Sequence, residues 1–400
     1  MHIIFFSHPS FLGSQSMPRF VQMLAVGMEQ RGHDIEVWSP KPLLYRLPMS
    51  TRFRKWLGYI DQYVVFPLLV RIRLSRCSPE TLFVFTDHAL GPWVPLVSNR
   101  FHVIHCHDFL AQLSAIGEIA DNPTSWTGRY YQAYIRRGYS TGKNFISVSN
   151  KTRDELHKLH RKRPAISEVV YNGLNRFFTS SAQTESRTKL AEVAGIDLSR
   201  GYILHIGGNE WYKNRLGVIE IYTAWRRQNN QRLMPLLMVG HNPSSILLET
   251  HSKSPYKGDI HWISDLGDDI VCSAYSGADV LLFPSLAEGF GWPIAEAMAC
   301  GCPVITTGEA PMTEVAGEAG FYIPRRPYNS QTIDNWASEA AEVVENVLTL
   351  TPSERSNVIE LGFENVRRFD TKLALNHIEK IYYHVLNIQI CSDPNTAQNA

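Results

Sequence analysis

The sequence has no long hydrophobic run and no excess of either charge. No segment approaches the roughly 18 consecutive apolar residues that a membrane-spanning helix needs. Lysine and arginine total 39, and aspartate and glutamate total 38, so the chain as a whole has no field that would attract nucleic acid. We therefore expect no membrane span and no nucleic-acid partner, and any charged partner must be recognised by a local site.

Cysteine is also scarce, and its spacing forms no known pattern. The six cysteines are scattered, and the one close pair is Cys300 and Cys302, so neither a zinc site nor a disulfide framework is indicated. A G-x-G-x-x-G fingerprint is missing, which argues against a dinucleotide oxidoreductase. The first residues, "MHIIFFSH", lack the basic stretch and cleavage site of a secretion signal. We expect a cytoplasmic protein without cofactor.

What the chain does contain is an alternation of strand-like and helix-like segments in both halves. With 400 residues, 44% of them hydrophobic, two domains are expected. The polar stretch 179–189 is interpreted as a linker or an insertion, and the boundary between a domain at 1–180 and a second at 195–368 is placed there. Two doubly wound, mostly parallel sheets are predicted, an α/β fold. The expected strands are 3–7, 35–40, 101–107, 144–149 and 167–173 in the first half and 202–208, 233–241, 260–264, 279–285 and 303–307 in the second.

One stretch, "FPSLAEGFGWPIAEAMACGCPVITT" (283–307), places two carboxylates around a glycine-rich turn. Its first residues end a predicted strand, and Pro293 suits the first position of a helix that ends before Gly301. Glu288 then lies beyond the carboxyl end of a strand, where ligands bind in open α/β sheets, and Glu296 lies in the first helical turn. Both could accept hydrogen bonds from sugar hydroxyls. The alternative, two acids that stabilise the start of a surface helix, stays open.

The same turn offers backbone amides to a ligand. Gly289 and Gly291 allow the backbone to approach closely. The amides of Phe290, Gly291 and Trp292 lie at the positive end of the predicted helix, which attracts an anion such as phosphate. The turn is therefore a candidate phosphate site.

This stretch resembles the E-x7-E signature of the retaining glycosyltransferases of family 4. "EGFGWPIAEAMACGCPVITT" is similar to the family's EGFG-x-P-x-x-EAMACG-x-PV pattern, although Trp292 stands where a smaller aliphatic residue is commoner. "SVSNKT" (147–152), "VVYNG" (169–173) and "APMTEVAGEAGFYI" (310–323) resemble further landmarks of the family. The resemblance extends from residue 1 to about residue 388. It implies the GT-B fold, with two Rossmann-like domains, a cleft between them and a C-terminal helix (371–388) that crosses back to the first domain.

The activity that the resemblance implies is hexosyl transfer from a nucleotide-diphosphate sugar, such as a UDP- or GDP-sugar, with retained configuration and without a metal ion. A glycan, a lipid-linked or a small-molecule acceptor would bind the N-terminal domain. Two alternatives remain: a nucleotide-sugar hydrolase or epimerase of the same fold, and a non-catalytic partner subunit that binds nucleotide sugar.

Residue by residue, the resemblance places Glu288 on hydroxyls of the donor sugar and Glu296 on the ribose. In "HIGGNEWYKN" (205–214), Gly207 ends a strand and Lys213 matches a lysine that neutralises the departing diphosphate. Gly208 stands where the family often has an arginine, so Arg215, a group of the N-terminal domain or the helix-end amides would have to compensate. The segment 261–264, with Ile263, is expected to read the base. A solvated lysine at the start of a helix is the alternative for position 213.

In the N-terminal half, the loop after the first strand contains Gly13 and Ser14, expected to face the diphosphate. "HCHDFLA" (105–111) ends another strand, and the resemblance favours His107 as the histidine that reaches the donor. Asp87 and His88 follow a further strand and are candidate acceptor residues. The alternatives are an ordinary connecting loop and histidines that are satisfied within the fold. For Asp108 we expect a helix cap.

Residues 41–76 combine eight basic residues and one acidic residue with aromatic residues. This composition predicts a helix-rich insertion that lies against an anionic membrane, on the cytoplasmic face. A solvated basic face over packed apolar helices is the equal alternative.

Overall fold

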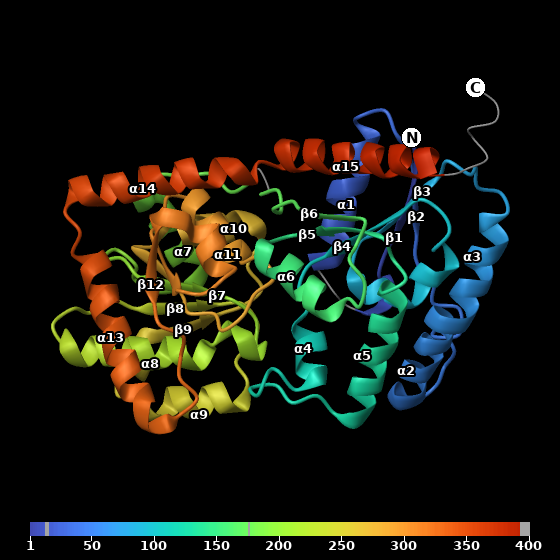
Figure 1. The fold of residues 1–400 in the computed structure, drawn as a ribbon. Coiled ribbons are helices and arrows are strands. Elements are labelled where there is room, and N and C mark those ends of the chain that lie inside the picture. The colour runs from blue at the N-terminus through green and yellow to red at the C-terminus, as the bar shows by residue number, and fades with distance from the viewer. Residues whose placement is uncertain (13–15, 175–176, 393–400) are drawn as a thin grey trace. The chain divides into compact units, whose positions relative to one another are not determined.

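A computed structural model of the chain describes residues 1–12, 16–174 and 177–392 (Figure 1). By their contacts the residues form two compact units. The first contains Met1–Tyr171 and the chain from Lys372 onward, and the second contains Asn172–Thr371. Each unit is built on one six-stranded parallel sheet. The predicted α/β class with two doubly wound sheets is confirmed.

The first sheet has the strand order β2-β1-β3-β4-β5-β6, and all neighbouring strands are parallel. Successive residues of β1 are buried on opposite faces: Ile4 and Phe6 join one hydrophobic cluster, and Ile3 and Phe5 join another. Burial on both faces requires helices on both sides of the sheet. The strands are β1 (His2–Phe6), β2 (Asp34–Trp38), β3 (Leu82–Phe85), β4 (His102–Cys106), β5 (Asn144–Ser147) and β6 (Ile166–Val169).

Two helices from opposite ends of the chain cover the face that carries Ile3 and Phe5. They are α1 (Ser16–Glu29) and α15 (Thr371–Ser392), which lie side by side in Figure 1. Ile378 and Tyr382 of α15 are buried in this cluster, so the C-terminal helix does return to the first unit, as predicted. The other face is covered by α4 (Leu110–Ile116), α5 (Trp126–Tyr139), α6 (Asn150–Leu159) and the 3₁₀ segment η3 (His88–Leu96).

The basic insertion folds into helices, as its composition indicates. It contains α2 (Thr51–Ile60), one π-helical turn and α3 (Phe66–Leu74). Its one acidic residue, Asp61, is 1% exposed and accepts hydrogen bonds from the backbone amides of Leu44 and Tyr45 at 2.9–3.1 Å. Asp61 therefore holds the segment that precedes α2 through buried hydrogen bonds. The charges of the insertion that face solvent are basic.

The second sheet has the order β12-β11-β10-β7-β8-β9, again entirely parallel. The segment interpreted as a linker, 179–189, is instead largely helical, because α7 begins at Gln183. Leu190 of α7 is fully buried, and Arg187 pairs with Asp279 at 2.8 Å, so apolar and charged contacts hold this polar sequence on the unit. The strands are β7 (Ile203–Ile206), β8 (Leu236–Val239), β9 (Ile260–Ile263), β10 (Val280–Phe283), β11 (Val304–Thr307) and β12 (Gly320–Ile323). The helices are α7 (Gln183–Ala194), α8 (Arg215–Gln228), α9 (Ser245–Lys253), α10 (Asp268–Gly277), α11 (Trp292–Ala299), α12 (Met312–Ala316), α13 (Ser330–Leu348) and α14 (Pro352–Val366).

Each sheet has one point where the strand order reverses. In the first unit it lies between β1 and β3, and in the second it lies between β7 and β10. At such a point the connections leave in opposite directions and open a crevice beyond the carboxyl ends of the two strands, where ligands bind in doubly wound sheets. Loops that follow β1, β3, β7 and β10 are therefore the first places to look for a site.

Two glycines bring α5 and η3 into backbone contact. A Cβ atom on Gly138 would lie 2.1 Å from the carbonyl oxygen of Gly91, and one on Gly91 would lie 2.3 Å from the carbonyl oxygen of Ile135. The clashing atoms are backbone atoms, which cannot rotate away. The close approach packs Trp93 and Tyr139 into the core beside the sheet.

We expect Gly138→Ala to lower the free energy of unfolding by about 1–3 kcal/mol, because the added methyl group overpacks this contact. Thermal unfolding measures the change, with Gly258→Ala as control, since a Cβ there meets nothing within 4 Å. A Gly138→Ala protein that melts at or above the wild-type temperature would contradict the packing of α5 on η3.

Candidate functional site

Two loops at the reversal point of the second sheet bring a lysine and a carboxylate together. Lys213 follows β7, and Glu288 follows β10. The Lys213 Nζ lies 2.7 Å from Glu288 Oε1, and the two side chains are 15% and 9% exposed. The Ser285 hydroxyl lies 2.6 Å from the same oxygen. The groups expected to hold the diphosphate and the donor sugar are thus direct neighbours, joined by an ion pair.

The backbone of the two loops is tied together, which fixes this pair. The amide of Leu286 donates to the carbonyl of Tyr212 at 2.7 Å. Asn214 adopts the left-handed conformation with φ 51°, and its side chain donates to the carbonyl of Pro284 at 2.8 Å and accepts from the amide of Gly217 at the start of α8. One asparagine therefore caps the helix and holds the second loop, so Lys213 and Glu288 are positioned by the backbone.

Glu296 lies in the helix that follows the glycine-rich turn. Gly291 has φ 104°, a left-handed conformation that favours glycine, and α11 begins at the next residue. Glu296 Oε2 accepts a hydrogen bond from the Tyr275 hydroxyl of α10 at 2.8 Å. Burial and the charge of Glu296 raise the pKa of Tyr275 well above its usual value. Tyr275 therefore stays protonated and keeps Glu296 in place. Gly289 and Phe290 lie in the same turn, and the Phe290 ring contacts Trp292 at a centroid distance of 5.4 Å.

The remaining predicted donor residues lie at neighbouring strand ends. The Gly207 amide donates to the carbonyl of Val239, and the carbonyl of Ile263 accepts from the Gly240 amide at 2.9 Å. Gly208 lies close to Glu210: a Cβ atom added to Gly208 would be 2.2 Å from the Glu210 carboxylate.

Arg215, considered as a substitute for the family's arginine, is 4% exposed. Its guanidinium donates to Asn209 Oδ1 at 2.6 Å and to the carbonyl of His241 at 2.8 Å, and it lies over the Trp262 ring. Burial lowers the pKa of Arg215 to about 10. The side chain holds the end of β8 and lies within the fold.

A second polar cluster lies at the reversal point of the first sheet. His8 follows β1, and its Nε2 is 2.8 Å from Asp87 Oδ2; His88 Nδ1 is 3.0 Å from Asp87 Oδ1. Burial opposes the charge of Asp87, but the two histidines outweigh it and hold the pKa of Asp87 well below its usual range. Burial likewise acts against His88, yet Asp87 raises the pKa of this imidazole. The arrangement is a buried carboxylate held between two imidazoles.

His107 follows β4 and lies near this cluster. Its Nε2 donates to the Thr86 carbonyl at 2.9 Å, and burial lowers its pKa, so the imidazole is neutral at pH 7. Asp108 accepts from the amide of Leu110, the first residue of α4, but the N-cap residue of this helix is Phe109, so Asp108 is not the helix cap that we expected. His105 is buried and bonds the Tyr382 hydroxyl, a structural contact. Gly13 and Ser14 lie outside the described residues.

Three residues around these sites were missed by sequence reasoning. His8 directly follows the first predicted strand, a position that is itself a signal. Ser285 ends the "FPS" run after β10, and its hydroxyl contacts Glu288. Tyr275 gave no signal, because a tyrosine in a half-buried helix is usually part of the core.

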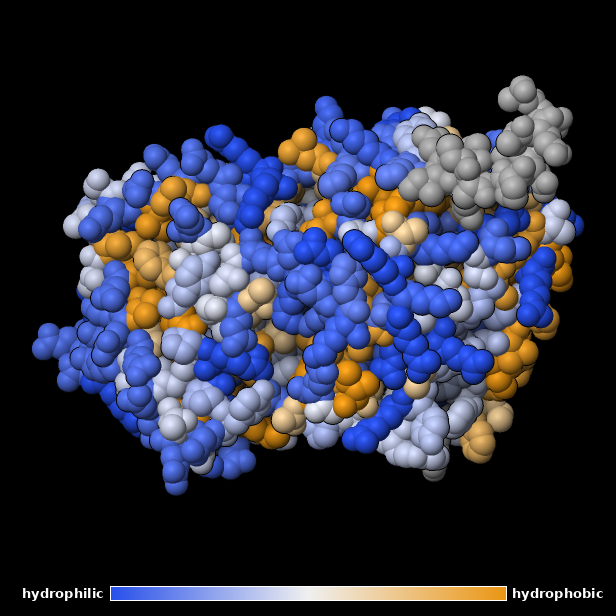
Figure 2. All heavy atoms as spheres, viewed as in Figure 1, coloured by the Kyte–Doolittle hydropathy of each residue, from blue (hydrophilic) through white to orange (hydrophobic). Residues whose placement is uncertain are grey.

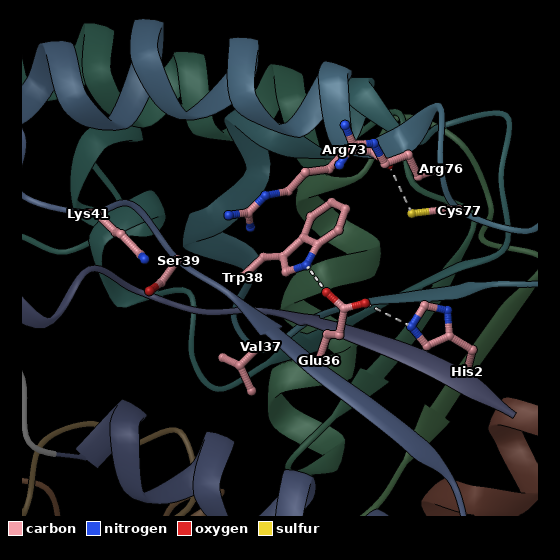
Figure 3. Close-up of a pocket in the computed structure, with 9 residues that line it drawn as sticks. All are labelled: His2, Glu36, Val37, Trp38, Ser39, Lys41, Arg73, Arg76 and Cys77. Atoms are coloured by element: carbon pink, nitrogen blue, oxygen red, sulfur yellow. Dashed lines mark hydrogen bonds and ion pairs between the residues drawn. The ribbon is translucent and has the colours of Figure 1, made fainter.

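A surface pocket of about 540 Å³ lies along β2, the edge strand of the first sheet (Figure 3). Arg73, Arg76 and Lys41 of the basic insertion contribute to its wall, with Arg73 over the Trp38 ring at 5.3 Å. Glu36 accepts from the Trp38 indole at 2.8 Å. The pocket therefore lies between β2 and the basic insertion, away from the reversal points of the sheets.

Over the described ranges, no cluster of three or more His, Cys, Asp or Glu side chains is arranged to hold a metal ion. Within the same residues no helix combines the length and the hydropathy needed to cross a membrane.

Most of the chain matches models of known protein families. Residues 17–176 match the model described as Glycosyltransferase Family 4, and residues 200–346 match the model described as Glycosyl transferases group 1, so that about three quarters of the chain is covered. The chain belongs to the family 4 type of glycosyltransferases. The first match includes Asp87, His88 and His107, and the second includes Lys213, Glu288 and Glu296.

This glycosyltransferase is similar to named sugar transferases and to solved structures. O-antigen chain mannosyltransferase B of Escherichia coli is 32% identical over 198 residues, which is 48% of this chain and 50% of that protein. O-antigen chain mannosyltransferase RfbU of Salmonella typhimurium is 22% identical over 80% of this chain and 79% of its own length. Among solved structures, WaaG, a glycosyltransferase involved in lipopolysaccharide biosynthesis, has a TM-score of 0.69 at 17% identity and covers 95% of this chain and 99% of its own. Anabaena HepE, solved in complex with UDP-glucose, has a TM-score of 0.65 at 16% identity, with 96% of this chain and all of that chain covered. These structures show the GT-B fold.

The buried ion pair predicts a measurable coupling. Replacing either Lys213 by Met or Glu288 by Gln leaves its partner without a counter-charge, so a double-mutant cycle should give a coupling energy of about 1–3 kcal/mol. The exposed pair Lys253–Glu249, at 2.6 Å with side chains 72% and 65% exposed, is the control and should couple by only about 0.3–0.5 kcal/mol. Thermal unfolding of the variants in each cycle measures the two coupling energies. Equal coupling energies would mean that Lys213 and Glu288 do not form the buried pair.

Proposed function

We propose that this glycosyltransferase moves a hexose from a nucleotide-diphosphate sugar to a glycan or lipid-linked acceptor and retains the anomeric configuration. The observation that carries the proposal is the Lys213–Glu288 pair at the reversal point of the second sheet. Glu296 lies in α11, the helix that follows the turn after Glu288. A cation for phosphate, a carboxylate for sugar hydroxyls and a second carboxylate for ribose therefore belong to one unit. This combination suits a nucleotide sugar and no simpler ligand.

In the proposed complex the diphosphate lies between Lys213 and the amides at the start of α11. An ammonium group has three donors, so Lys213 can bind phosphate oxygens while it keeps one hydrogen bond to Glu288. Glu288 then accepts from hydroxyls of the donor sugar, with Ser285 as its second partner. Glu296, oriented by Tyr275, accepts from the ribose hydroxyls, and backbone near Ile263 borders the base.

The proposed chemistry rests on orientation and charge. The transition state of glycosyl transfer resembles an oxocarbenium ion, and negative charge grows on the departing phosphate. Lys213 and the helix-end amides stabilise that charge in a largely buried position, which makes a metal ion unnecessary. Because the leaving phosphate takes the acceptor proton on the same face of the sugar, no separate general base is needed. Glu288 holds the sugar in the reactive orientation.

For the acceptor we propose the cluster in the first unit. Asp87, between His8 and His88, lies at the reversal point of its own sheet and is 2.8 Å from a partly exposed imidazole. The fixed carboxylate offers hydrogen-bond acceptors for hydroxyls of the acceptor sugar. His107, neutral and near the same cluster, is assigned to the donor sugar or its phosphate. Mannose is the first sugar to test, because the two O-antigen relatives are named mannosyltransferases. The remaining alternatives are hydrolysis or epimerisation of the donor, and nucleotide-sugar binding without catalysis.

The test compares Lys213→Ala, Glu288→Ala and Glu296→Ala with the control Glu342→Ala, an exposed residue of α13. Transfer from GDP-mannose, UDP-glucose and related donors is measured, and calorimetry measures nucleoside diphosphate binding. Lys213→Ala should lose on the order of 10²-fold in rate, as expected for removal of a preorganised charge. Glu288→Ala should lower turnover with little change in nucleotide affinity, whereas Glu296→Ala should weaken nucleotide binding.

Unchanged nucleotide affinity in Glu296→Ala, together with wild-type transfer rates in all three variants, would overturn the assignment. Loss of donor without any added acceptor would favour the hydrolase or epimerase, and binding without turnover of any donor would favour the non-catalytic subunit. Product stereochemistry, read by NMR, separates retention from inversion.

We further propose that residues 41–76 bind an anionic membrane surface at the cytoplasmic face. Large apolar side chains of this segment are exposed: Leu43, Leu47, Met49, Phe53, Trp56, Ile60, Val64, Leu68, Leu69 and Ile72. In Figure 2 hydrophobic surface gathers along the side of the first unit where Figure 1 shows α3. Because Asp61 is buried, the exposed charged side chains of residues 41–76 are all basic. Apolar side chains that enter a headgroup layer, beside cations that attract its phosphates, are typical of an interfacial segment.

Co-sedimentation with vesicles tests this surface. Binding should require anionic lipid and weaken with salt. Reversing two charges, Arg71→Glu with Arg76→Glu, should lower binding at least about tenfold, since each basic residue near the surface contributes about 1 kcal/mol. The matched control, Arg161→Glu with Lys162→Glu, changes exposed residues outside the segment and should leave binding unchanged. Equal binding to neutral vesicles, or equal loss in both variants, would reject the proposal.

A further inference from the structure

Two thiols of the second unit lie in contact although they are distant in sequence. Cys272 of α10 and Cys300, at the C-terminal end of α11, have their sulfur atoms 3.6 Å apart. Sequence spacing gave no sign of this pair, because the two cysteines are 28 residues apart. The cysteine close to Cys300 in sequence, Cys302, donates to the carbonyl of Pro303 instead. The contact joins the two helices that carry Tyr275 and Glu296.

The two sulfurs have different environments. Cys272 is partly exposed, whereas Cys300 is 1% exposed. The hydrogen bond between the two sulfurs lowers the pKa of Cys272 to about 6, and the same hydrogen bond and burial raise the pKa of Cys300. Cys272 Sγ also lies 3.5 and 3.3 Å from the carbonyl oxygens of Phe177 and Thr179. A partly exposed sulfur beside a buried one is the arrangement of an attacking and a resolving cysteine.

The other described cysteines lack this combination. Cys106 is fully buried, and burial raises its pKa. Burial also raises the pKa of Cys302 to about 12 and that of Cys77 above its usual value. Among the five cysteines whose side chains the structure describes, Cys272 is thus the thiol whose pKa is lowered, and its sulfur contacts that of Cys300.

We propose that Cys272 and Cys300 are a redox modification site that forms an intramolecular disulfide in the presence of a peroxide. The Cys272 thiolate attacks a peroxide oxygen and becomes a sulfenic acid, with release of hydroxide that takes up a proton. The Cys300 sulfur then displaces the sulfenic hydroxyl, and its proton leaves with that oxygen as water. Two thiols lose two electrons, and one hydrogen peroxide becomes two waters. A dithiol reduces the bond back to two thiols by disulfide exchange and is itself oxidised to a disulfide.

Formation of the bond requires a local movement. A disulfide has a sulfur–sulfur distance of about 2.05 Å, so the two atoms must approach by about 1.5 Å from their present contact. Cys300 lies one helical turn after Glu296, and Cys272 lies one turn before Tyr275. Closing the bond therefore shifts the two helices that hold the 2.8 Å hydrogen bond between Tyr275 and Glu296. Through the ribose role of Glu296, which rests on the proposed function, oxidation should weaken nucleotide binding.

Peptide mapping of the full chain tests the site itself. After treatment with hydrogen peroxide, a crosslinked peptide pair containing Cys272 and Cys300 is expected in the wild type and in the control Cys77→Ser, a thiol of the other unit, and it should vanish with dithiothreitol. Cys300→Ser should leave a sulfenic acid at Cys272 that dimedone traps, whereas Cys272→Ser should leave Cys300 unmodified. Absence of the crosslink, or dimedone labelling of Cys300 in place of Cys272, would overturn the proposal.

Calorimetry with nucleoside diphosphate tests the consequence for binding. Oxidised wild type should bind about fivefold more weakly than reduced wild type, a typical coupling between sites, while Cys272→Ser should bind equally under both conditions. An unchanged affinity in crosslinked protein would refute the coupling to Glu296. If the reduced wild type bound no nucleotide, the proposed function would be wrong, and the peptide map would still decide whether the two thiols react.

Discussion

Parallel strands place all their carboxyl ends at one edge of a sheet, and this constraint determines where chemistry can occur in both units. Within that edge, the reversal of strand order leaves an opening between two adjacent strands. In the second sheet the opening lies between β7 and β10, whose loops supply Lys213 and Glu288. In the first it lies between β1 and β3, whose loops supply His8 and Asp87. The same topological rule thus selects both candidate sites.

The ion pair between Lys213 and Glu288 shows why these positions need support from the backbone. Charges that are only 15% and 9% exposed lose much of their hydration, and their mutual attraction is favourable only where geometry is well fixed. Asn214 supplies that geometry, because its left-handed backbone turns the chain and its side chain bonds both the start of α8 and the loop after β10. A donor diphosphate would then meet a lysine that is already oriented, which is the basis of electrostatic preorganisation.

Sequence alone predicted two parallel sheets and most of their strands, because buried parallel strands appear as short apolar runs; β12 (Gly320–Ile323) was not among the expected strands. It also singled out Lys213 and Glu288 as separate candidates, whereas their direct contact depends on how two loops far apart in sequence meet. Tyr275 could not be found for the same reason, since its partner Glu296 lies on another helix. The segment 179–189 was wrongly interpreted as a linker, because α7 is held by a few buried residues within a polar sequence.

We propose that the second unit holds a nucleotide sugar across Lys213, Glu288 and Glu296. A crystal structure of the protein with a bound nucleoside diphosphate would show whether it does. We expect a phosphate oxygen within about 3.2 Å of Lys213 Nζ and a ribose hydroxyl within the same distance of a Glu296 carboxylate oxygen. A nucleotide bound elsewhere, with the Lys213–Glu288 pair untouched, would contradict it.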